Sequence, residues 1–180
     1  AVPNNKLKKY LPELRRLAKE ESDDTSNLKG FASAWKSLAN DKEFRAAQDK
    51  VNDRLYYQPA MKRSDNAGLK TALARAVMYD TVIQHGDGDD PDSFYALIKR
   101  TNKKAGGSPK DGIDEKKWLN KFLEVRYDDL MNPANHDTRD EWRESVARVD
   151  VLRSIAKENN YNLNGPIHVR SNEYGNFVIK

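Results

Sequence analysis

The chain has 180 residues, with 32 Lys plus Arg, 28 Asp plus Glu and a net charge of +4. It has no Cys, which excludes disulfides, thiol catalysis and thiolate metal sites. Its length suits one globular domain with a real core, and its three Trp, eight Tyr and five Phe exclude a disordered chain. No apolar run approaches the roughly 18 residues of a membrane span, so the sequence predicts a soluble protein.

The N-terminal part of the chain predicts short helices separated by polar loops, over about 7–17, 31–38 and 43–55. Pro12 predicts a break or a fresh start in the first helix, and Pro59 is expected to end or kink the third. Asn40 and Glu43 have the spacing of a capping box, which places the start of the third helix near residue 41.

The rest of the chain predicts further helices over about 68–85, 91–104, 114–131 and 140–158. The segment 105–112 is rich in Gly and is the clearest flexible loop. The tail from Ile167 alternates and contains Tyr174-Gly175-Asn176, so we expect a small C-terminal hairpin. The predicted fold class is therefore mainly α, with one hairpin.

Three charged residues lie on the apolar faces of these helices, where a surface charge is not expected. Asp80 is in phase with an apolar stripe of the helix 68–85, Arg126 shares the stripe of the helix 114–131, and Arg148 lies at the edge of the last apolar face. The stripe around Asp80 consists of Leu69, Leu73, Ala76, Val77 and Ile83. Because an unpaired charge removed from water costs several kcal/mol, we expect these three groups to pair. Two Arg around one carboxylate would leave a positive site that could hold a second carboxylate. A purely structural ion cluster is equally compatible with the pattern.

An acidic window from Asp80 to Phe94 contains five Asp and no Lys or Arg. It carries a charge of −5, and since the whole chain is +4, the remaining residues sum to +9. The window does not fit a calcium loop, because Pro91 and Asp92 stand where such a loop needs an acid or Asn and then Gly. Two interpretations remain: a solvated Gly/Asp turn, or the rim of a site for a cationic ligand. His85 and the lack of compensating cations in the window favour the second interpretation.

Other motifs of known chemistry are absent from the sequence. The three His have no metal-ligand spacing, and there is no GxSxG, Walker or GxGxxG motif, so we expect neither a metal nor a cofactor. Basic and acidic residues are interleaved outside the acidic window, which argues against a nucleic-acid partner. Trp35, Trp118 and Trp142 fall on helical stripes, and we expect core packing rather than sugar stacking.

Several segments, in order along the chain, resemble the chitosanases of glycoside hydrolase family 46. They are KYLPEL, NDRLYYQP, YDTVIQHGDGDDPDSF, FLEVR, NHDT and RVD, and the resemblance covers essentially all 180 residues. It implies a mainly helical, two-lobed, lysozyme-like fold, with residues 1–180 as the larger, C-terminal part of one such domain. It also implies an inverting endo-hydrolase that cleaves β-1,4 bonds between D-glucosamine units of chitosan and needs no cofactor. We therefore expect a secreted, monomeric enzyme with chitosan or glucosamine oligosaccharides as its partner.

The resemblance also assigns expected roles to individual residues. Asp80, Arg126 and Arg148 match the family's Asp-Arg-Arg network behind the general-acid Glu, although Arg139 or Arg143 could take the place of Arg148. The stretch from His85 to Asp90 resembles the family's sugar-binding wall, which makes substrate contacts of four residues, His85, Asp87, Asp89 and Asp90. Some relatives have a substrate-binding Glu after the FLEVR helix, where this chain has Asn132-Pro133, and Asp137 is the nearest acidic candidate.

The catalytic Glu and Asp of the family have no counterpart in these residues. The resemblance places both in an N-terminal segment that precedes the KYLPEL region in the family, so we expect that segment to be a partner of this chain. The competing interpretation is a non-catalytic polysaccharide-binding or structural helical module.

Overall fold

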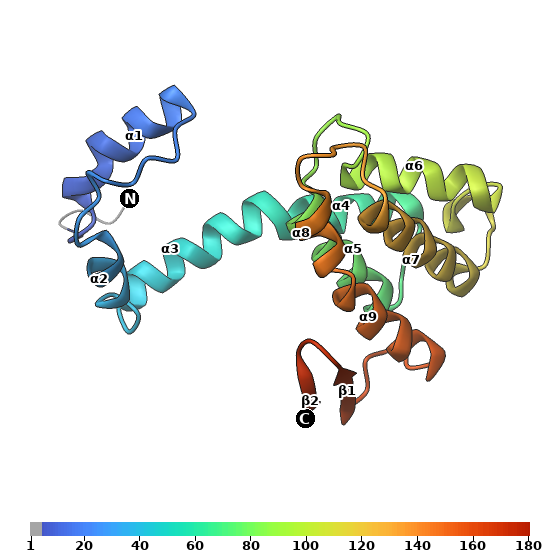
Figure 1. The fold of residues 1–180 in the computed structure, drawn as a ribbon. Coiled ribbons are helices and arrows are strands. Elements are labelled where there is room, and N and C mark those ends of the chain that lie inside the picture. The colour runs from blue at the N-terminus through green and yellow to red at the C-terminus, as the bar shows by residue number, and fades with distance from the viewer. Residues whose placement is uncertain (1–4) are drawn as a thin grey trace. The chain divides into compact units, whose positions relative to one another are not determined.

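Helices dominate residues 5–180, which are the residues that the structure, a computed structural model, describes (Figure 1). The chain divides into two compact units, one ending at Leu55 and the other beginning at Tyr56. A single antiparallel hairpin completes the described part of the chain. The predicted fold class, mainly α with a small C-terminal hairpin, is confirmed. None of the described helices is long and apolar enough to cross a lipid bilayer.

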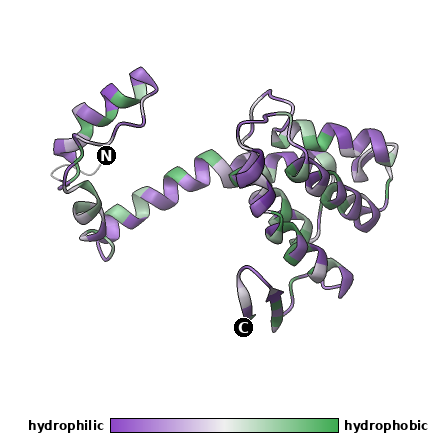
Figure 2. Cartoon of the chain, in the orientation of Figure 1, coloured by the Kyte–Doolittle hydropathy of each residue, from purple (hydrophilic) through white to green (hydrophobic). Residues whose placement is uncertain are grey.

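The first unit contains η1 (Lys8–Tyr10), α1 (Leu11–Glu20), α2 (Phe31–Lys36) and α3 (Lys42–Asn52). Figure 2 shows hydrophilic and hydrophobic residues mixed along α1 and α3, as in amphipathic helices. Pro12 lies in the first turn of α1, where it needs no hydrogen-bond partner. The N-cap of α3 is Asp41, whose carboxylate accepts a hydrogen bond from Phe44 N at 2.9 Å. The predicted cap, Asn40, is wrong by one residue, because the carboxylate that accepts from a free N–H of the first turn belongs to Asp41.

A row of aromatic rings holds the first unit together. Tyr10 contacts Phe31 edge-on with ring centroids 5.3 Å apart, and Trp35 lies between Phe31 and Phe44 at 5.8 and 4.9 Å. Trp35 is nevertheless 42% exposed, so its predicted place in a core is wrong within this chain. The 6-residue helix α2 buries none of its residues, because a helix of fewer than two turns is too short to enclose an indole ring by itself.

The second unit begins within the π-helical turn η2 (Asp53–Tyr57) and contains most of the core. Its helices are α4 (Gln58–Ala67), α5 (Ala72–His85), α6 (Phe94–Ala105), η3 (Pro109–Asp111), α7 (Glu115–Met131), α8 (Arg139–Glu144) and α9 (Ala147–Lys157). Pro59 lies in the first turn of α4, in agreement with the prediction that it ends or kinks the preceding helix. Side-chain caps at Thr71, Ser93 and Asp114 fix where α5, α6 and α7 begin.

The core of the second unit forms between α5, α6 and α7. Leu73, Val77, Phe94, Leu97 and Phe122 are completely buried there. Trp118 is also completely buried, as predicted, and its indole N–H donates to Asn102 at 2.8 Å. Ile83, by contrast, is 42% exposed, so its predicted place on the apolar stripe is wrong, and this side of α5 is open.

The Gly-rich segment 105–112 is more ordered than the sequence predicts. It contains η3, and Ser108 and Asp111 close a capping box around it. Gly68 makes this packing possible, because it has φ +80° and a Cβ at this position would lie 2.6 Å from the backbone N of Lys110.

The predicted long helix over 140–158 is wrong, because the chain turns a corner between α8 and α9. The Ser145 hydroxyl donates to Trp142 O at 2.6 Å at this corner. A tight backbone turn accompanies it, with Val146 N donating to Arg143 O at 3.3 Å. The helical pattern of the sequence continues across the corner, so periodicity alone does not predict the break.

The hairpin consists of β1 (Ile167–Ser171) and β2 (Gly175–Ile179), with Ile167 opposite Ile179 and Ser171 opposite Gly175. β1 packs against α9 and buries Ile167 and Val169. Every residue of β2 is exposed.

Candidate functional site

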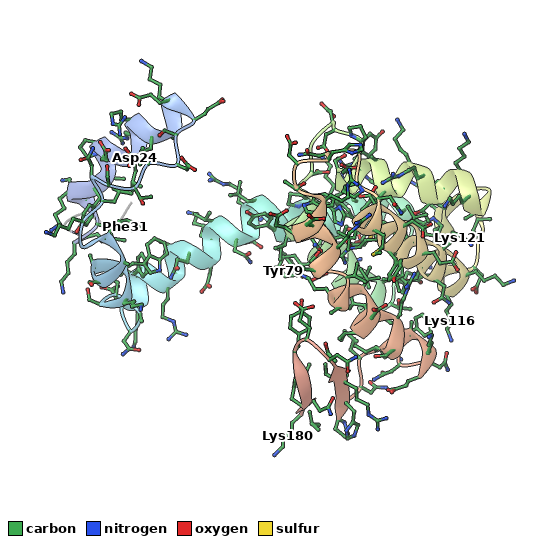
Figure 3. All side chains as sticks on the ribbon, viewed as in Figure 1. Asp24, Phe31, Tyr79, Lys116, Lys121 and Lys180 are labelled. Carbon is green, nitrogen blue, oxygen red and sulfur yellow. The ribbon has the colours of Figure 1, made fainter. Side chains whose placement is uncertain are left out.

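The guanidinium of Arg126 is the centre of a charged cluster inside the second unit. Its side chain comes from α7 and is completely buried. All three of its nitrogens face side chains of α5. Nη1 lies 2.7 Å from Asp80 Oδ2, Nη2 donates to Gln84 Oε1 at 2.6 Å, and Nε donates to His85 Nε2 at 3.4 Å. Figure 3 labels Tyr79, which precedes Asp80 on α5 and marks this part of the helix.

Asp80 joins two arginines from different helices. Its second oxygen, Oδ1, accepts from Arg148 Nη2 of α9 at 2.5 Å. Burial raises the pKa of Asp80, but the charges and hydrogen bonds of Arg126 and Arg148 outweigh it and hold the pKa below its usual value. Burial lowers the pKa of Arg126, and the charge of Asp80 opposes that effect. Two guanidinium groups therefore share one carboxylate, and the cluster carries a net positive charge.

The structure resolves which arginine completes the cluster. Arg148 pairs with Asp80 and its side chain is 34% exposed, so part of the guanidinium faces the surface. Arg139 instead contacts His136 Nδ1 at 2.5 Å, and Arg143 donates its Nε–H to Met131 O at 2.9 Å. The cluster is therefore Asp80–Arg126–Arg148, and we call it the ion network.

His85 lies behind the ion network rather than on an open surface. Its side chain is completely buried, its Nδ1 donates to Asp92 O at 2.9 Å, and its Nε2 accepts from Arg126. Because a carbonyl oxygen can only accept, this arrangement requires the neutral Nδ1–H tautomer. Burial and the charge of Arg126 lower the pKa of His85 to about 3, so the ring stays neutral. Both ring nitrogens are occupied, and His85 holds the acidic loop and the ion network together.

Asp129 is a buried carboxylate next to His85. It lies one turn after Arg126 on α7, and its Oδ2 is 3.6 Å from His85 Nδ1. Its other oxygen pairs with Arg100 of α6. Burial raises the pKa of Asp129 to about 6, although Arg100 acts in the opposite direction.

The acidic loop between α5 and α6 divides into structural and open carboxylates. Asp92 is buried, and its two oxygens accept from the backbone N–H groups of Ala134 and Asn135 at 2.8 and 2.9 Å. Asp90 accepts from Asp92 N at 3.0 Å, so it also shapes the loop.

Asp90 is also exposed, and two further acids of this loop face solvent. Asp87 pairs with Arg63 of α4 at 2.6 Å, and the Arg63 guanidinium lies 4.5 Å from the Tyr95 ring centroid. Asp89 is exposed, and its carboxylate makes no ion pair with any residue among 5–180. The loop therefore presents negative charge on the surface next to the ion network.

Asp137 lies in a second loop, between α7 and α8, where its backbone N–H donates to Asn135 Oδ1 at 3.0 Å. Since Asp92 binds Ala134 and Asn135, the two loops are tied together. Asp137 is exposed, so its carboxylate and those of Asp87 and Asp89 belong to loops that share one anchor.

Four residues of this region were not predicted from the sequence, namely Gln84, Asp92, Asp129 and Ser145. Gln84 and Ser145 are neutral, so they do not stand out on a helical stripe as a charge does. Asp129 does lie on the apolar face of α7, three residues after Arg126, and that phase was a usable signal.

Comparisons with known proteins show which proteins the chain is similar to. A family model described as glycosyl hydrolase family 46 matches residues 1–167. A chitosanase of Bacillus subtilis (strain 168) is 99% identical over 180 residues, which are 100% of this chain and 65% of the relative. The chain thus spans about two thirds of the length of that relative.

Two solved structures are similar over nearly the whole chain. One is a mutant chitosanase from Bacillus subtilis MY002 complexed with 6 GlcN, with a TM-score of 0.94 and 99% identity, covering 99% of this chain and 74% of that one. The other is a chitosanase of Gynuella sunshinyii in complex with chitotetraose, with a TM-score of 0.91 and 40% identity, covering 99% and 73%.

Proposed function

Because the chain belongs to glycosyl hydrolase family 46, we propose that it forms the larger part of an endo-chitosanase. The enzyme would hydrolyse β-1,4 bonds between D-glucosamine units of chitosan. The similar chitosanases with bound 6 GlcN and chitotetraose support this substrate class. The observation within the chain that carries the proposal is the ion network, since a buried carboxylate shared by two arginines is suited to supporting another acid.

The proposed reaction is inverting hydrolysis, in which a general acid protonates the glycosidic oxygen and a general base activates a water. In such enzymes the two carboxyl groups lie roughly 6.5–9.5 Å apart, which leaves room for the water. We assign the acid, a Glu, and the base, an Asp, to the part of the family's enzymes that these 180 residues do not span. No cofactor takes part in this chemistry.

The ion network would act on the Glu through its positive charge. Arg126 is enclosed by α5, but Arg148 is partly exposed and has N–H groups beyond the one on Asp80. A carboxylate placed at Arg148 would find a fixed hydrogen-bond donor, which sets its orientation and its pKa. The role of the network is therefore to position the acid and to tune its proton affinity.

The open acids of the two tied loops would bind the amino groups of the substrate. Chitosan carries an ammonium group on each protonated glucosamine unit, and Asp87, Asp89, Asp90 and Asp137 supply negative charge on one side of the unit. His85 contributes indirectly, because it anchors the acidic loop through Asp92 O. The attraction is electrostatic and would weaken as salt is added.

The remaining expectations belong to the same proposal. We propose that the enzyme is secreted and acts as a monomer, with no nucleic-acid partner. The alternative function, a non-catalytic polysaccharide-binding module, applies to the 180 residues by themselves if the acid and base are supplied by other residues.

A reducing-end assay on chitosan tests the proposal. The 180-residue chain alone should release no new reducing ends, while the longer Bacillus subtilis chitosanase, which is 99% identical over these residues, should release them. Binding is measured separately, as the retention of glucosamine oligomers by the 180-residue chain. Asp89→Asn in the same chain should weaken this retention. Hydrolysis by the 180 residues alone would overturn the assignment of the acid and the base.

A further inference from the structure

Residues of α8, of α9 and of the corner between them contact all three α5 side chains that hold Arg126. As described above, the Arg126 guanidinium has three partners on α5, and each of them has its own contact at the corner. Arg148 pairs with Asp80, the Ser145 hydroxyl accepts from Gln84 Nε2, and the Trp142 ring lies edge-on to His85 with ring centroids 4.9 Å apart. The corner residues 142, 145 and 148 are spaced by three, so they line one face of the turn, where α9 packs against α5 (Figure 1).

Arg126 and Ser145 together fix which end of the Gln84 amide faces Arg126. An amide has an oxygen that accepts and an NH₂ group that donates. Its oxygen accepts from Arg126 Nη2 at 2.6 Å, and its NH₂ group donates to Ser145 Oγ. If the amide were turned over, its NH₂ group would face the guanidinium, donor against donor. The Ser145 hydroxyl is itself fixed, because it donates to Trp142 O at 2.6 Å.

We propose that Gln84 and Ser145 are positioning residues that hold Arg126, and through it Asp80, at a set place in the ion network. This inference rests on the proposed function and specifies how the site is kept in register.

The test compares two serines in similar settings. Ser145→Ala removes the hydroxyl that orients Gln84, and Ser145→Thr keeps it. Ser154→Ala is the matched control, because Ser154 is also half-buried and its hydroxyl also donates to a carbonyl three residues earlier, Val151 O at 2.7 Å. Ser154 has no contact with the ion network. Ser145→Cys is a second variant of similar size with a weak hydrogen-bonding group, in case Ser145→Ala does not fold.

The first readout needs no activity. In the isotopically labelled 180-residue chain, NMR measures how fast the Arg126 Nε–H exchanges with solvent, and Arg126→Lys identifies the signal by its loss. Loss of one hydrogen bond in the shell is expected to speed this exchange about 2- to 10-fold in Ser145→Ala and Ser145→Cys. Ser145→Thr and Ser154→Ala should leave it unchanged. Equal exchange in Ser145→Ala and Ser154→Ala would overturn the proposal.

The second readout uses the longer Bacillus subtilis chitosanase with the same substitutions. Ser145→Ala should lower kcat by a similar factor with KM unchanged, and Ser145→Thr should restore it. An equal loss in Ser154→Ala would mean general destabilisation and would contradict a positioning role. If the unsubstituted longer enzyme does not cleave chitosan, the proposed function fails, and the exchange measurement still decides the inference about Gln84 and Ser145.

Discussion

Replacing Asp80 with Asn removes the only anion that touches the Arg126 guanidinium among residues 5–180. The other two partners of Arg126, Gln84 and His85, are neutral, the latter because its pKa is about 3. The guanidinium is completely buried, so it would remain in the core as an uncompensated charge. Removing one partner of a buried ion pair costs about 3–5 kcal/mol, and Asp80→Asn should lie in that range at pH 7.

Removing the arginine instead of the aspartate should lower the free energy of unfolding by less. Arg126→Met fills much of the same volume and leaves Asp80, whose side chain is 26% exposed and still paired with Arg148. The remaining charge is therefore both partly hydrated and compensated. The double variant combines Asp80→Asn with Arg126→Met. Because it contains no buried unpaired cation, it should be more stable than Asp80→Asn alone.

Urea unfolding of the 180-residue chain, followed by circular dichroism, measures these free energies. The expected order of stability is wild type, then Arg126→Met and the double variant, then Asp80→Asn. Asp65→Asn is the matched control, since Asp65 also pairs with an arginine, Arg75, but its side chain is 65% exposed, and the change should cost less than about 1 kcal/mol. The reasoning is refuted if Asp80→Asn costs no more than Arg126→Met, or if the two changes simply add.

Three further predictions concern pH, backbone packing and ligand binding. Between about pH 4 and 6 two buried groups should oppose each other: the pKa of His85 falls to about 3 on folding, which favours folding as pH rises, and the pKa of Asp129 rises to about 6, which favours folding as pH falls. Relative to wild type, His85→Gln should therefore lose stability as pH rises from 4 to 6 and Asp129→Asn should gain it, each by about 2 kcal/mol; parallel curves would contradict this assignment. Gly68→Ala should destabilise the chain by about 1–3 kcal/mol, because the new Cβ meets the backbone of Lys110, whereas Gly106→Ala, at a similar φ but with open space, should cost less; equal losses in thermal unfolding would refute the role of this contact. Asp89→Asn should weaken binding of a glucosamine oligomer by calorimetry at low salt and have little effect at high salt, and a loss that does not depend on salt would argue against an electrostatic rim.

The sequence was sufficient for most of the helices and for the charged centre of the site. Helical spacing predicts helices over 68–85, 91–104 and 114–131, which lie within a few residues of α5, α6 and α7. Asp80, Arg126 and Arg148 were identifiable because a charge on an apolar stripe needs a partner, and the structure pairs them. Local signals of this kind depend only on residue type and period.

Other features depend on contacts between distant segments, which periodicity does not contain. The corner at Ser145 interrupts a continuous helical pattern, and Ser145 and Arg148 there contact Gln84 and Asp80 of another helix. His85 was expected on a binding surface, but its neighbours Asp92 and Arg126 enclose it. The exposure of Trp35 likewise depends on what surrounds a short helix rather than on its stripe.

We propose above all that the ion network supports the acid of a chitosan-cleaving enzyme. The most direct test is steady-state kinetics of the longer Bacillus subtilis chitosanase on a glucosamine oligomer, with Asn at the position of Asp80. If the network orients the general acid, kcat should fall by about 100-fold while KM changes little, at a temperature where the variant is folded. An unchanged kcat, or a change confined to KM, would contradict the claim.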